Sequence, residues 1–415
     1  MNKEVKKGLV PDFRFPEFLD SGEWEEINLG SIGKVSMCKR ILKDETKPYG
    51  DIPFYKIGTF GKQADAYISK DVYERYKSKY SYPKKGDILI SASGTIGRLV
   101  IFNGEAAYFQ DSNIVWIGNN ENLVKNSFLF YCYKRIKWAT DNNTIARLYN
   151  DNLSGMKIFI TSMPEQTKIA ACLSSLDDLI TAQTQKIEAL KTHKKGLMQQ
   201  LFPQEGETVP KLRFPEFMDS GEWECTTIGE VGKFYYGKSA PKWSLSNDAP
   251  TLCVRYGELY TKFGTIISEV LSRTNIDPSN LKFSKGGEIL VPRVGEVPQD
   301  FAKNCCYLPF PNIAIGEMIS VYETKEYPIF YTYYFRTMEQ QFSRVVEGQN
   351  VRNLYYVNLE PIVIGKPSIP EQTKIADCLS SLDELIYSQV KKLDVLKLHK
   401  KGLMQGLFPS SNEAA

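Results

Sequence analysis

Residue types that most enzymes use for chemistry are scarce in this sequence. It contains only two histidines, His193 and His399, so a nucleophilic serine or cysteine activated by histidine is nearly excluded. Eight cysteines are present, but no two are spaced as C-x-x-C, so no zinc site or other metal site is predicted. The [ND]-P-P-[YF] segment, with which amino-methyltransferases hold the target amine, does not occur. The sequence therefore predicts a protein without catalytic residues.

Long apolar runs are also missing. No stretch is long enough to cross a bilayer, and the first residues, MNKEVKKGLVPDF, have lysines without the apolar segment of a signal peptide. We therefore expect a cytoplasmic protein with reduced cysteines and no membrane partner. The net charge is only +3, with 20 Lys and Arg against 14 Asp and Glu in residues 25–160 and 15 against 15 in residues 224–366. Any surface that binds nucleic acid must be local, because the overall field is weak.

Two glycine-containing segments resemble nucleotide-binding motifs. Gly232–Ser239 matches the phosphate-loop pattern G-x-x-x-x-G-K-[ST], which requires a helix that opens at the Lys-Ser pair. Pro241 comes two residues after Ser239, no helical periodicity follows it, and the bulky KFYY favours a strand, so a hairpin is predicted here. Ser91–Gly97 lacks the G-x-G-x-x-G spacing of dinucleotide sites. A nucleotide hydrolase is left as an alternative that a nucleotide-binding measurement would test.

What the sequence does contain is two long repeats. Residues 164–203 and 370–409 both begin PEQTKIA and differ at only 11 of 40 aligned positions. RFPEFLDSGEW at Arg14–Trp24 returns at Arg213–Trp223 with one change, Leu19 to Met218. Each half therefore has an RFPEF segment, a variable region and a repeated helix. This duplication predicts a pseudo-two-fold, circular arrangement in which the two ends of the chain lie close together.

The repeated helices have the pattern of a coiled coil. Apolar residues recur at alternating spacings of four and three, which is typical of coiled-coil seams. They are Ile169, Leu173, Leu176, Ile180, Ile187, Leu190, Leu197 and Leu201, and then Ile375, Leu379, Leu382, Ile386, Leu393, Leu396, Leu403 and Leu407. Lys194 and Lys400 occupy further seam positions. In an antiparallel pair Gln183 would face Gln389, and the two amides are predicted to fix the register. The alternative is that both glutamines are exposed and interrupt the stripe.

The variable regions contain many short strands. KGDILISASG and GGEILVPRVG align at an offset of 201 residues, which indicates two divergent copies of one fold. Helical stretches are expected at Ser127–Trp138 and Ile329–Phe342. We predict an α+β protein with two mixed α/β domains separated by two long helices that form an antiparallel coiled coil. The predicted segments are 1–160, 164–203, 204–366 and 370–409, with a tail at 410–415.

Two variable domains that alternate with two near-identical P-x-E-Q-x-K-I-A helices resemble the specificity subunit of type I restriction-modification enzymes. IPFYKIG…KKGDILISASGTIG is similar to the target-recognition domains of that family. The resemblance implies a sequence-specific subunit that reads a bipartite target in double-stranded DNA. It also implies that two modification subunits dock on the helices and that restriction subunits join the complex. The chain itself would then be no enzyme and hold no cofactor, because S-adenosylmethionine, ATP and magnesium would be bound by the partners.

Sequence readout requires Arg, Lys, Asn and Gln side chains that reach base edges, with further polar and aromatic groups on the backbone. Candidates in predicted loops of the first domain are Lys39, Arg40, Lys62, Ser93, Arg98, Arg147, Tyr149 and Asn150. In the second domain they are Lys238, Lys242, Trp243, Arg255, Tyr256, Arg293, Gln349, Asn350 and Arg352. The main alternative is a coiled-coil scaffold whose two domains bind proteins, which the neutral charge of the second region favours.

Overall fold

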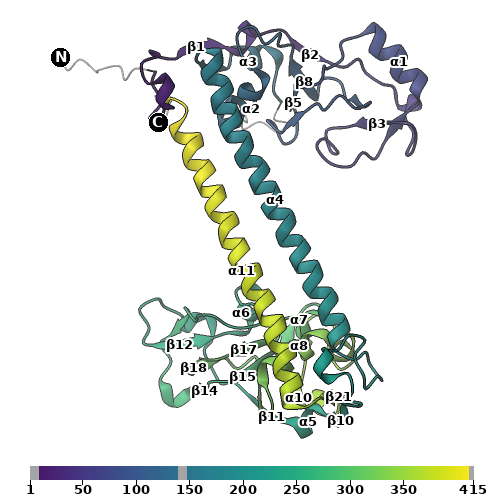
Figure 1. The fold of residues 1–415 in the computed structure, drawn as a ribbon, viewed down its shortest axis with the longest axis vertical. Coiled ribbons are helices and arrows are strands. Elements are labelled where there is room, and N and C mark those ends of the chain that lie inside the picture. The colour runs from purple at the N-terminus through teal and green to yellow at the C-terminus, as the bar shows by residue number, and fades with distance from the viewer. Residues whose placement is uncertain (1–8, 139–146, 411–415) are drawn as a thin grey trace, which may run out of the picture. The chain divides into compact units, whose positions relative to one another are not determined.

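The computed structural model describes residues 9–138 and 147–410, so the first residues and most of the predicted tail lie outside the described ranges. The fold is α+β, with two β-rich domains joined by the long helices α4 (Met163–Leu201) and α11 (Ile369–Gly406), as predicted (Figure 1). The chain divides into two compact units. One comprises Met1–Ala182 and Leu393–Ala415, and the other Gln183–Lys392. Each unit therefore contains one β-rich domain, part of α4 and part of α11.

Within residues 9–138 and 147–160, the first domain has three small sheets. The largest has the antiparallel order β2 (Val35–Met37), β8 (Ile114–Ile117), β5 (Ile88–Ser91) and β6 (Leu99–Ile101). The second has the order β4 (Tyr67–Ile68), β3 (Ile52–Tyr55) and β7 (Tyr108–Phe109), with β3 and β7 parallel. The third pairs β1 (Glu25–Asn28) with β9 (Lys157–Ile160). The helices are α1 (Lys70–Lys79), α2 (Asn126–Arg135) and α3 (Asn150–Gly155), with 3-10 turns at Pro16–Phe18, Leu29–Ser31 and Lys43–Glu45.

The second domain repeats these sheets. The largest has the antiparallel order β11 (Gly232–Tyr236), β19 (Ile319–Thr324), β15 (Glu288–Pro292) and β17 (Cys306–Leu308). Another has the order β13 (Arg273–Thr274), β12 (Thr251–Val254), β18 (Pro311–Ile315) and β14 (Phe283–Lys285). Two pairs remain, β10 (Glu224–Thr227) with β21 (Val363–Lys366) and β16 (Val294–Gly295) with β20 (Arg352–Asn353). The helices are α5 (Ile228–Val231), α6 (Tyr256–Thr261), α7 (Asp300–Lys303), α8 (Pro328–Thr337), α9 (Glu339–Arg344) and α10 (Tyr356–Leu359), with 3-10 turns at Pro215–Phe217, Lys242–Ser244 and Pro278–Asn280.

The strand orders show that the two domains are copies of one fold. The order β2-β8-β5-β6 matches β11-β19-β15-β17, and the parallel pair β3 and β7 matches β12 and β18. The segments that align at an offset of 201 form the equivalent strands β5 and β15. One expectation was incomplete. The helical stretch expected at Ile329–Phe342 is two helices, α8 and α9, because Met338 between them leaves the helical conformation with φ −92° and ψ 37°.

The core of each domain lies between its largest sheet and the long helices. Strand β5 is buried along its whole length, which explains its unbroken apolar run Ile88–Ile90. Phe128 of α2 and Leu173 of α4 belong to the same buried cluster as β5. In the second unit β15, α8 and Leu379 of α11 make the equivalent cluster. Part of the apolar face of each long helix is thus buried against the β-rich domain that precedes it in the chain.

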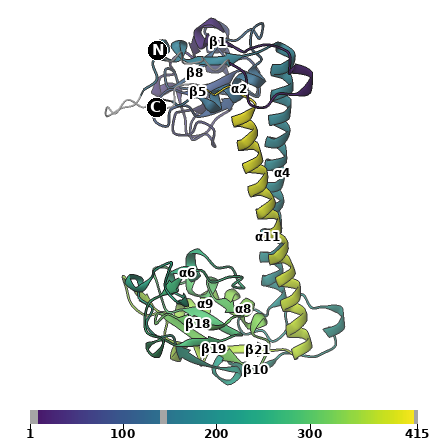
Figure 2. The ribbon, with the colours of Figure 1, turned by 90° about the vertical axis from the view of Figure 1, so that its left-hand side faces the viewer.

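The seam residues predicted from the heptad pattern all lie on the buried or half-buried side of α4 and α11. In the second unit Lys194 Nζ lies 2.5 Å from Asp383 Oδ1, and in the first unit Lys400 pairs with Asp177. Gln183 Nε2 donates to Gln389 Oε1 at 3.0 Å and to the Gln389 carbonyl oxygen at 2.9 Å. As the residue number rises along α4 from Gln183 to Lys194, the number of the partner on α11 falls from Gln389 to Asp383. The two helices are therefore antiparallel. Figure 2 shows them side by side from a second direction.

The ion pair at Asp177 predicts that the first unit loses stability in acid. Burial opposes the charge of this carboxylate, but hydrogen bonds from Lys400 and Tyr131 and the charge of Lys134 outweigh it and lower the pKa of Asp177. A carboxyl group whose pKa is lower when folded stabilises the fold above its unfolded pKa, about 3.9, and this stability is lost as the pH falls through the folded value. We expect Asp177→Asn to be less stable at neutral pH and to lose less stability below about pH 4 than the wild type. Thermal unfolding across the pH range would measure this, and Asp178→Asn, at the exposed neighbouring carboxylate, should leave the wild-type pH dependence unchanged.

The two repeated motifs of each half bind each other. Arg14 of the first RFPEF segment contacts Glu165 of PEQTKIA through two parallel hydrogen bonds, with Nε–Oε1 2.7 Å and Nη2–Oε2 2.8 Å. Arg213 and Glu371 repeat this geometry at 2.6 and 2.7 Å. Gln166, the next residue of the motif, accepts a hydrogen bond from the Lys125 amide that precedes α2. Part of the reason for the identity of the repeats is therefore internal packing.

The two ends of the described chain meet, as the circular pattern predicted. In the first unit the Phe13 amide donates to the Gly406 carbonyl at 2.8 Å, and Trp24 packs edge-on against Phe408 with ring centroids 5.8 Å apart. In the second unit the Leu212 amide donates to Gln200 at 2.9 Å, across a connection that is covalently continuous. The contact between the end of a long helix and the RFPEF segment thus occurs twice. In the second unit a loop connects the two segments, and in the first unit they meet only through non-covalent contacts.

Three further expectations concern the phosphate-loop match, the cysteines and membrane spans. Gly232–Tyr236 of the phosphate-loop match is strand β11, and no helix opens at Lys238 and Ser239. All eight cysteines are free thiols, and burial raises the pKa of Cys253 to about 11, so this thiol is protonated at neutral pH. Among the described residues, none of the helices is long and apolar enough to cross a membrane.

Candidate nucleic-acid interface

In the first domain, one short loop joins three candidate residues from separate parts of the chain. The loop, Asp111–Asn113, precedes β8. Arg40 Nε donates to Asp111 at 2.9 Å, Ser93 Oγ to Asn113 Oδ1 at 2.8 Å, and Arg147 Nη2 to the Ser112 carbonyl at 3.5 Å. A bridge between Ser93 and Arg147 closes the group. These three candidates, far apart in sequence, therefore share one surface.

An open hollow of about 510 Å³ adjoins this group. Lys39 and Arg40 line it together with Tyr80 and Asp111, and Lys39 Nζ lies 5.5 Å from the Tyr80 ring centroid. Arg40 is 68% exposed although it is paired, so its guanidinium remains open to a ligand. Cationic side chains around a hollow suit a phosphate backbone or a base edge.

The other candidates of the first domain have different settings. Arg98 is half-buried, and its Nη1 donates to the Phe60 carbonyl at 2.8 Å, so it holds the loop that carries the exposed Lys62. Tyr149 is 63% exposed and Asn150 begins α3. The structure therefore brings Lys39, Arg40, Ser93 and Arg147 together around one loop and its hollow. Arg98 instead donates to the Phe60 carbonyl, in a different loop.

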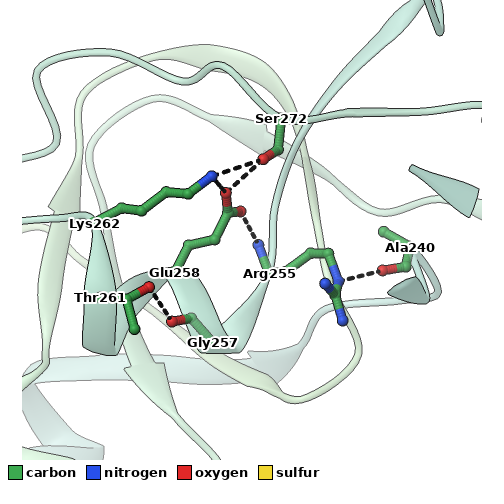
Figure 3. A network of polar contacts seen from close by, with 7 residues as sticks. All are labelled: Ala240, Arg255, Gly257, Glu258, Thr261, Lys262 and Ser272. Carbon is green, nitrogen blue, oxygen red and sulfur yellow. Dashed lines mark hydrogen bonds and ion pairs between the residues drawn. The ribbon is translucent and has the colours of Figure 1, made fainter. Parts of the chain in front are cut away.

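In the second domain, five candidates lie on two segments that contact each other. Lys238, Lys242 and Trp243 follow β11, whereas Arg255 and Tyr256 lie where β12 passes into α6. Arg255 Nε donates to the Ala240 carbonyl at 3.1 Å, which joins the two segments. Figure 3 shows how buried Glu258 supports Arg255, by accepting from the Arg255 amide at 2.9 Å, from Lys262 at 2.9 Å and from Ser272.

Arg293 of the second domain lies against two aromatic rings. Its guanidinium carbon lies 4.4 Å from the Tyr236 ring centroid and 5.4 Å from that of Tyr355. Its Nε is buried and has no hydrogen-bond partner among the described residues. The pair β16–β20 places Arg352 opposite Gly295, two residues after Arg293, while Gln349 and Asn350 are exposed on the preceding turn. Arginine, glutamine and asparagine side chains are the types that hydrogen-bond base edges.

Sequence reasoning missed the residues that hold these side chains. Asp111 and Glu258 are acidic, so a search for cations passes over them, although each fixes an arginine. Tyr236 and Tyr355 were hidden among the 24 tyrosines of the chain. The sequence indicated these loops only through their place in the chain, because they follow predicted strands that align between the two halves.

The histidines take no part in this surface. His193 and His399 are exposed on the long helices. Within the described ranges, no three His, Cys, Asp or Glu side chains are grouped so that they could hold a metal ion.

The chain is similar to known proteins over most of its length. Residues 21–192 match the family model for the type I restriction modification DNA specificity domain. The type I restriction enzyme MjaVIII specificity subunit of Methanocaldococcus jannaschii is 24% identical over 98% of this chain and 96% of its own. A relative in Haemophilus influenzae, named as a type I restriction enzyme specificity subunit, is 60% identical over 38% of this chain, and the match spans 42% of that relative.

The fold is similar as well. The crystal structure of a type I restriction-modification S subunit from M. genitalium aligns with a TM-score of 0.61 at 15% identity, covering 97% of this chain and all of that one. This chain belongs to the type I specificity subunits. The specificity subunit is a non-catalytic component of a type I restriction-modification enzyme, and S-adenosylmethionine and ATP belong to the modification and restriction subunits. A DNA target-specificity subunit needs surfaces that read sequence, and the two loop clusters above supply candidates for them.

Proposed function

We propose that the chain reads a bipartite DNA target, with one half-site bound by each β-rich domain. The observation that carries this proposal is that the domains share one strand order but present different side chains at equivalent loop positions. Strand register makes Met37 equivalent to Tyr236, so Arg40 corresponds to Ser239. Two readers with a common scaffold and different contacts suit two different half-sites. The 17 candidate side chains are the proposed contacts, although Arg98 is half-buried and its guanidinium already donates to the Phe60 carbonyl.

We also propose that α4 and α11 dock two copies of the modification subunit. Internal packing explains identity at buried positions but not at exposed ones. Lys186, Lys191, His193 and Lys195 of α4 are exposed, and α11 has the same residue types at Lys392, Lys397, His399 and Lys401, which are also exposed. A partner that binds each half in the same way would account for this identity. Gln183 and Gln389 would keep the register of the helices, and hence of the docking surfaces.

The proposed complex contains double-stranded DNA, two modification subunits that methylate adenine with S-adenosylmethionine, and restriction subunits that use ATP and magnesium. Its place would be the cytoplasm, with the chromosomal DNA. One solved complex supports such an assembly. Its title concerns complex assembly and conformational transition of the type I R-M system, and it aligns with a TM-score of 0.54 at 13% identity over 93% of this chain and 98% of its own.

Methylation mapping in a host that carries this chain and its modification subunit would test the proposal. We expect N6-methyladenine at one split, asymmetric motif. Exchange of residues 25–160 for the corresponding region of another specificity subunit should change only one half of the motif. A matched exchange of the α4 segment 164–203 for residues 370–409 should leave the motif unaltered. If the bound, active partner adds no methylation, the variable domains read something other than DNA, and the scaffold function takes its place.

A further inference from the structure

Trp243 is presented to solvent by an anchored turn. Its side chain is 76% exposed, on the 3-10 turn Lys242–Ser244. A single exposed apolar residue needs no explanation by itself, because such residues are common on protein surfaces. What distinguishes Trp243 is the number of contacts that hold its turn in place.

The turn is fixed at both ends. Ser244, which directly follows Trp243, is fully buried, and its hydroxyl bonds the Pro241 carbonyl and the Thr274 hydroxyl, each at 2.7 Å. The Asn275 amide donates to the Ser244 carbonyl at 3.0 Å. On the other side, Arg255 holds Ala240 (Figure 3). The indole therefore sits on a rigid support and would lose little conformational freedom on binding a ligand.

The surroundings of Trp243 favour a polyanion. Lys238 and Lys242 are exposed on the same segment, and the two Nη groups of Arg255 have no hydrogen-bond partner among the described residues. An aromatic ring among cations is the arrangement by which proteins hold a nucleic-acid backbone while a planar side chain contacts bases.

Comparison of the two domains argues against a protein partner. The equivalent turn of the first domain is Lys43–Glu45, and Asp44 takes the position of Trp243. A partner that docks on both halves would need the same contact twice, whereas a half-site needs its contact once. The position differs where the two readers differ, so it belongs to the second half-site.

We propose that Trp243 inserts its ring at one base step of the second half-site and unstacks that step. The inference rests on the proposed function and adds a mode of reading to it. Hydrogen bonds identify bases directly, whereas an inserted ring selects a step that unstacks at low energy, such as a pyrimidine–purine step. Lys238, Lys242 and Arg255 would hold the phosphates on either side of the opened step.

The test uses the complex of this chain with its modification subunits and a duplex that carries the mapped motif, with 2-aminopurine placed at each position of the second half-site in turn. Apart from the adenine that is methylated, which methyltransferases flip out of the stack, we expect the fluorescence to rise at one step with the wild type and with Trp243→Phe. Trp243→Ala should abolish the rise and weaken specific binding by about 5- to 150-fold, the range for loss of one base–aromatic contact. Leu42→Ala, at the 55% exposed leucine before the equivalent turn, should leave both readouts unchanged.

Three outcomes would overturn the inference. Fluorescence that rises with the wild type at no position other than the methylated adenine would show that Trp243 unstacks no base. Equal affinity of Trp243→Ala and the wild type for the target would remove the DNA contact. Weaker binding of the modification subunit by Trp243→Ala, with DNA affinity intact, would make Trp243 a protein contact. A wild-type complex without specific DNA binding would refute the proposed function itself, and methylation mapping identifies that case separately.

Discussion

Replacement of Arg14 by alanine should lower the free energy of unfolding of the first unit by about 3–5 kcal/mol, the usual cost of removing one partner of a buried ion pair. The Arg14 and Glu165 side chains are 4% and 1% exposed, so solvent cannot compensate the carboxylate that the substitution leaves behind. The hydrogen bond and charge of Glu165 raise the pKa of Arg14 even though burial acts against it. Arg213→Ala should have the same effect on the second unit, where Glu371 is equally buried.

Hydrogen exchange is the appropriate measurement, because a chain of two units need not unfold in one step. Arg14→Ala should increase exchange in the first turns of α4, and Arg213→Ala in the first turns of α11. Lys168→Ala is the matched control. Lys168 and its partner Glu17 come from the same two motifs but are 51% and 46% exposed, so the loss of stability should be much smaller than in Arg14→Ala. Similar losses in Arg14→Ala and Lys168→Ala would show that the buried pair has no special weight.

The second expected result concerns reading of DNA. Gly237→Ala should weaken specific binding of the assembled complex by about 100-fold or more, since three of the proposed DNA contacts lie on the segment that this glycine opens. A Cβ at Gly237 would lie 2.2 Å from the Gly316 carbonyl oxygen and 2.5 Å from that of Ile315. Both are backbone atoms, so the segment that carries Lys238, Lys242 and Trp243 must move.

Two altered duplexes would show which reader is damaged. When the second half-site is scrambled, the wild type should lose affinity, whereas the affinity of Gly237→Ala should stay the same as for the intact target. When the first half-site is scrambled, both proteins should lose affinity. Gly264→Ala is the control in the same domain, because a Cβ there meets no atom within 4 Å. If the two glycine variants bind alike, the turn after β11 does not contribute to readout.

Much of the architecture could be predicted from the repeats. Near-identical segments must make near-identical contacts, so two copies of one heptad pattern implied two equivalent helices, and the offset between KGDILISASG and GGEILVPRVG implied equivalent strands. Two charged seam positions could be placed but not paired. Only the structure shows that Lys194 pairs with Asp383 and Lys400 with Asp177, each on the other copy of the repeat.

The candidate site was much less predictable. Cationic loop residues can be chosen from sequence by type and place, and such a choice cannot tell Arg40, which stays 68% exposed, from Arg98, which is used to hold the Phe60 carbonyl. The difference depends on which backbone groups a long side chain can reach after folding. Glu258 shows the same limit from the other side, since its carboxylate becomes a support for Arg255 only through the turn into α6 and the approach of Ser272.

By itself, the sequence determined the duplication, the apolar seam of the helices and the resemblance to a family. It also predicted that Gln183 faces Gln389. Each of these is a pattern in the order of residues along one chain. The tertiary structure alone decided that the two repeated motifs bind each other through Arg14 and Glu165, that Asp111–Asn113 gathers three distant candidates, and that Trp243 stands on a fixed turn. These are contacts between segments far apart in sequence. They depend on distances and burial that no local pattern encodes.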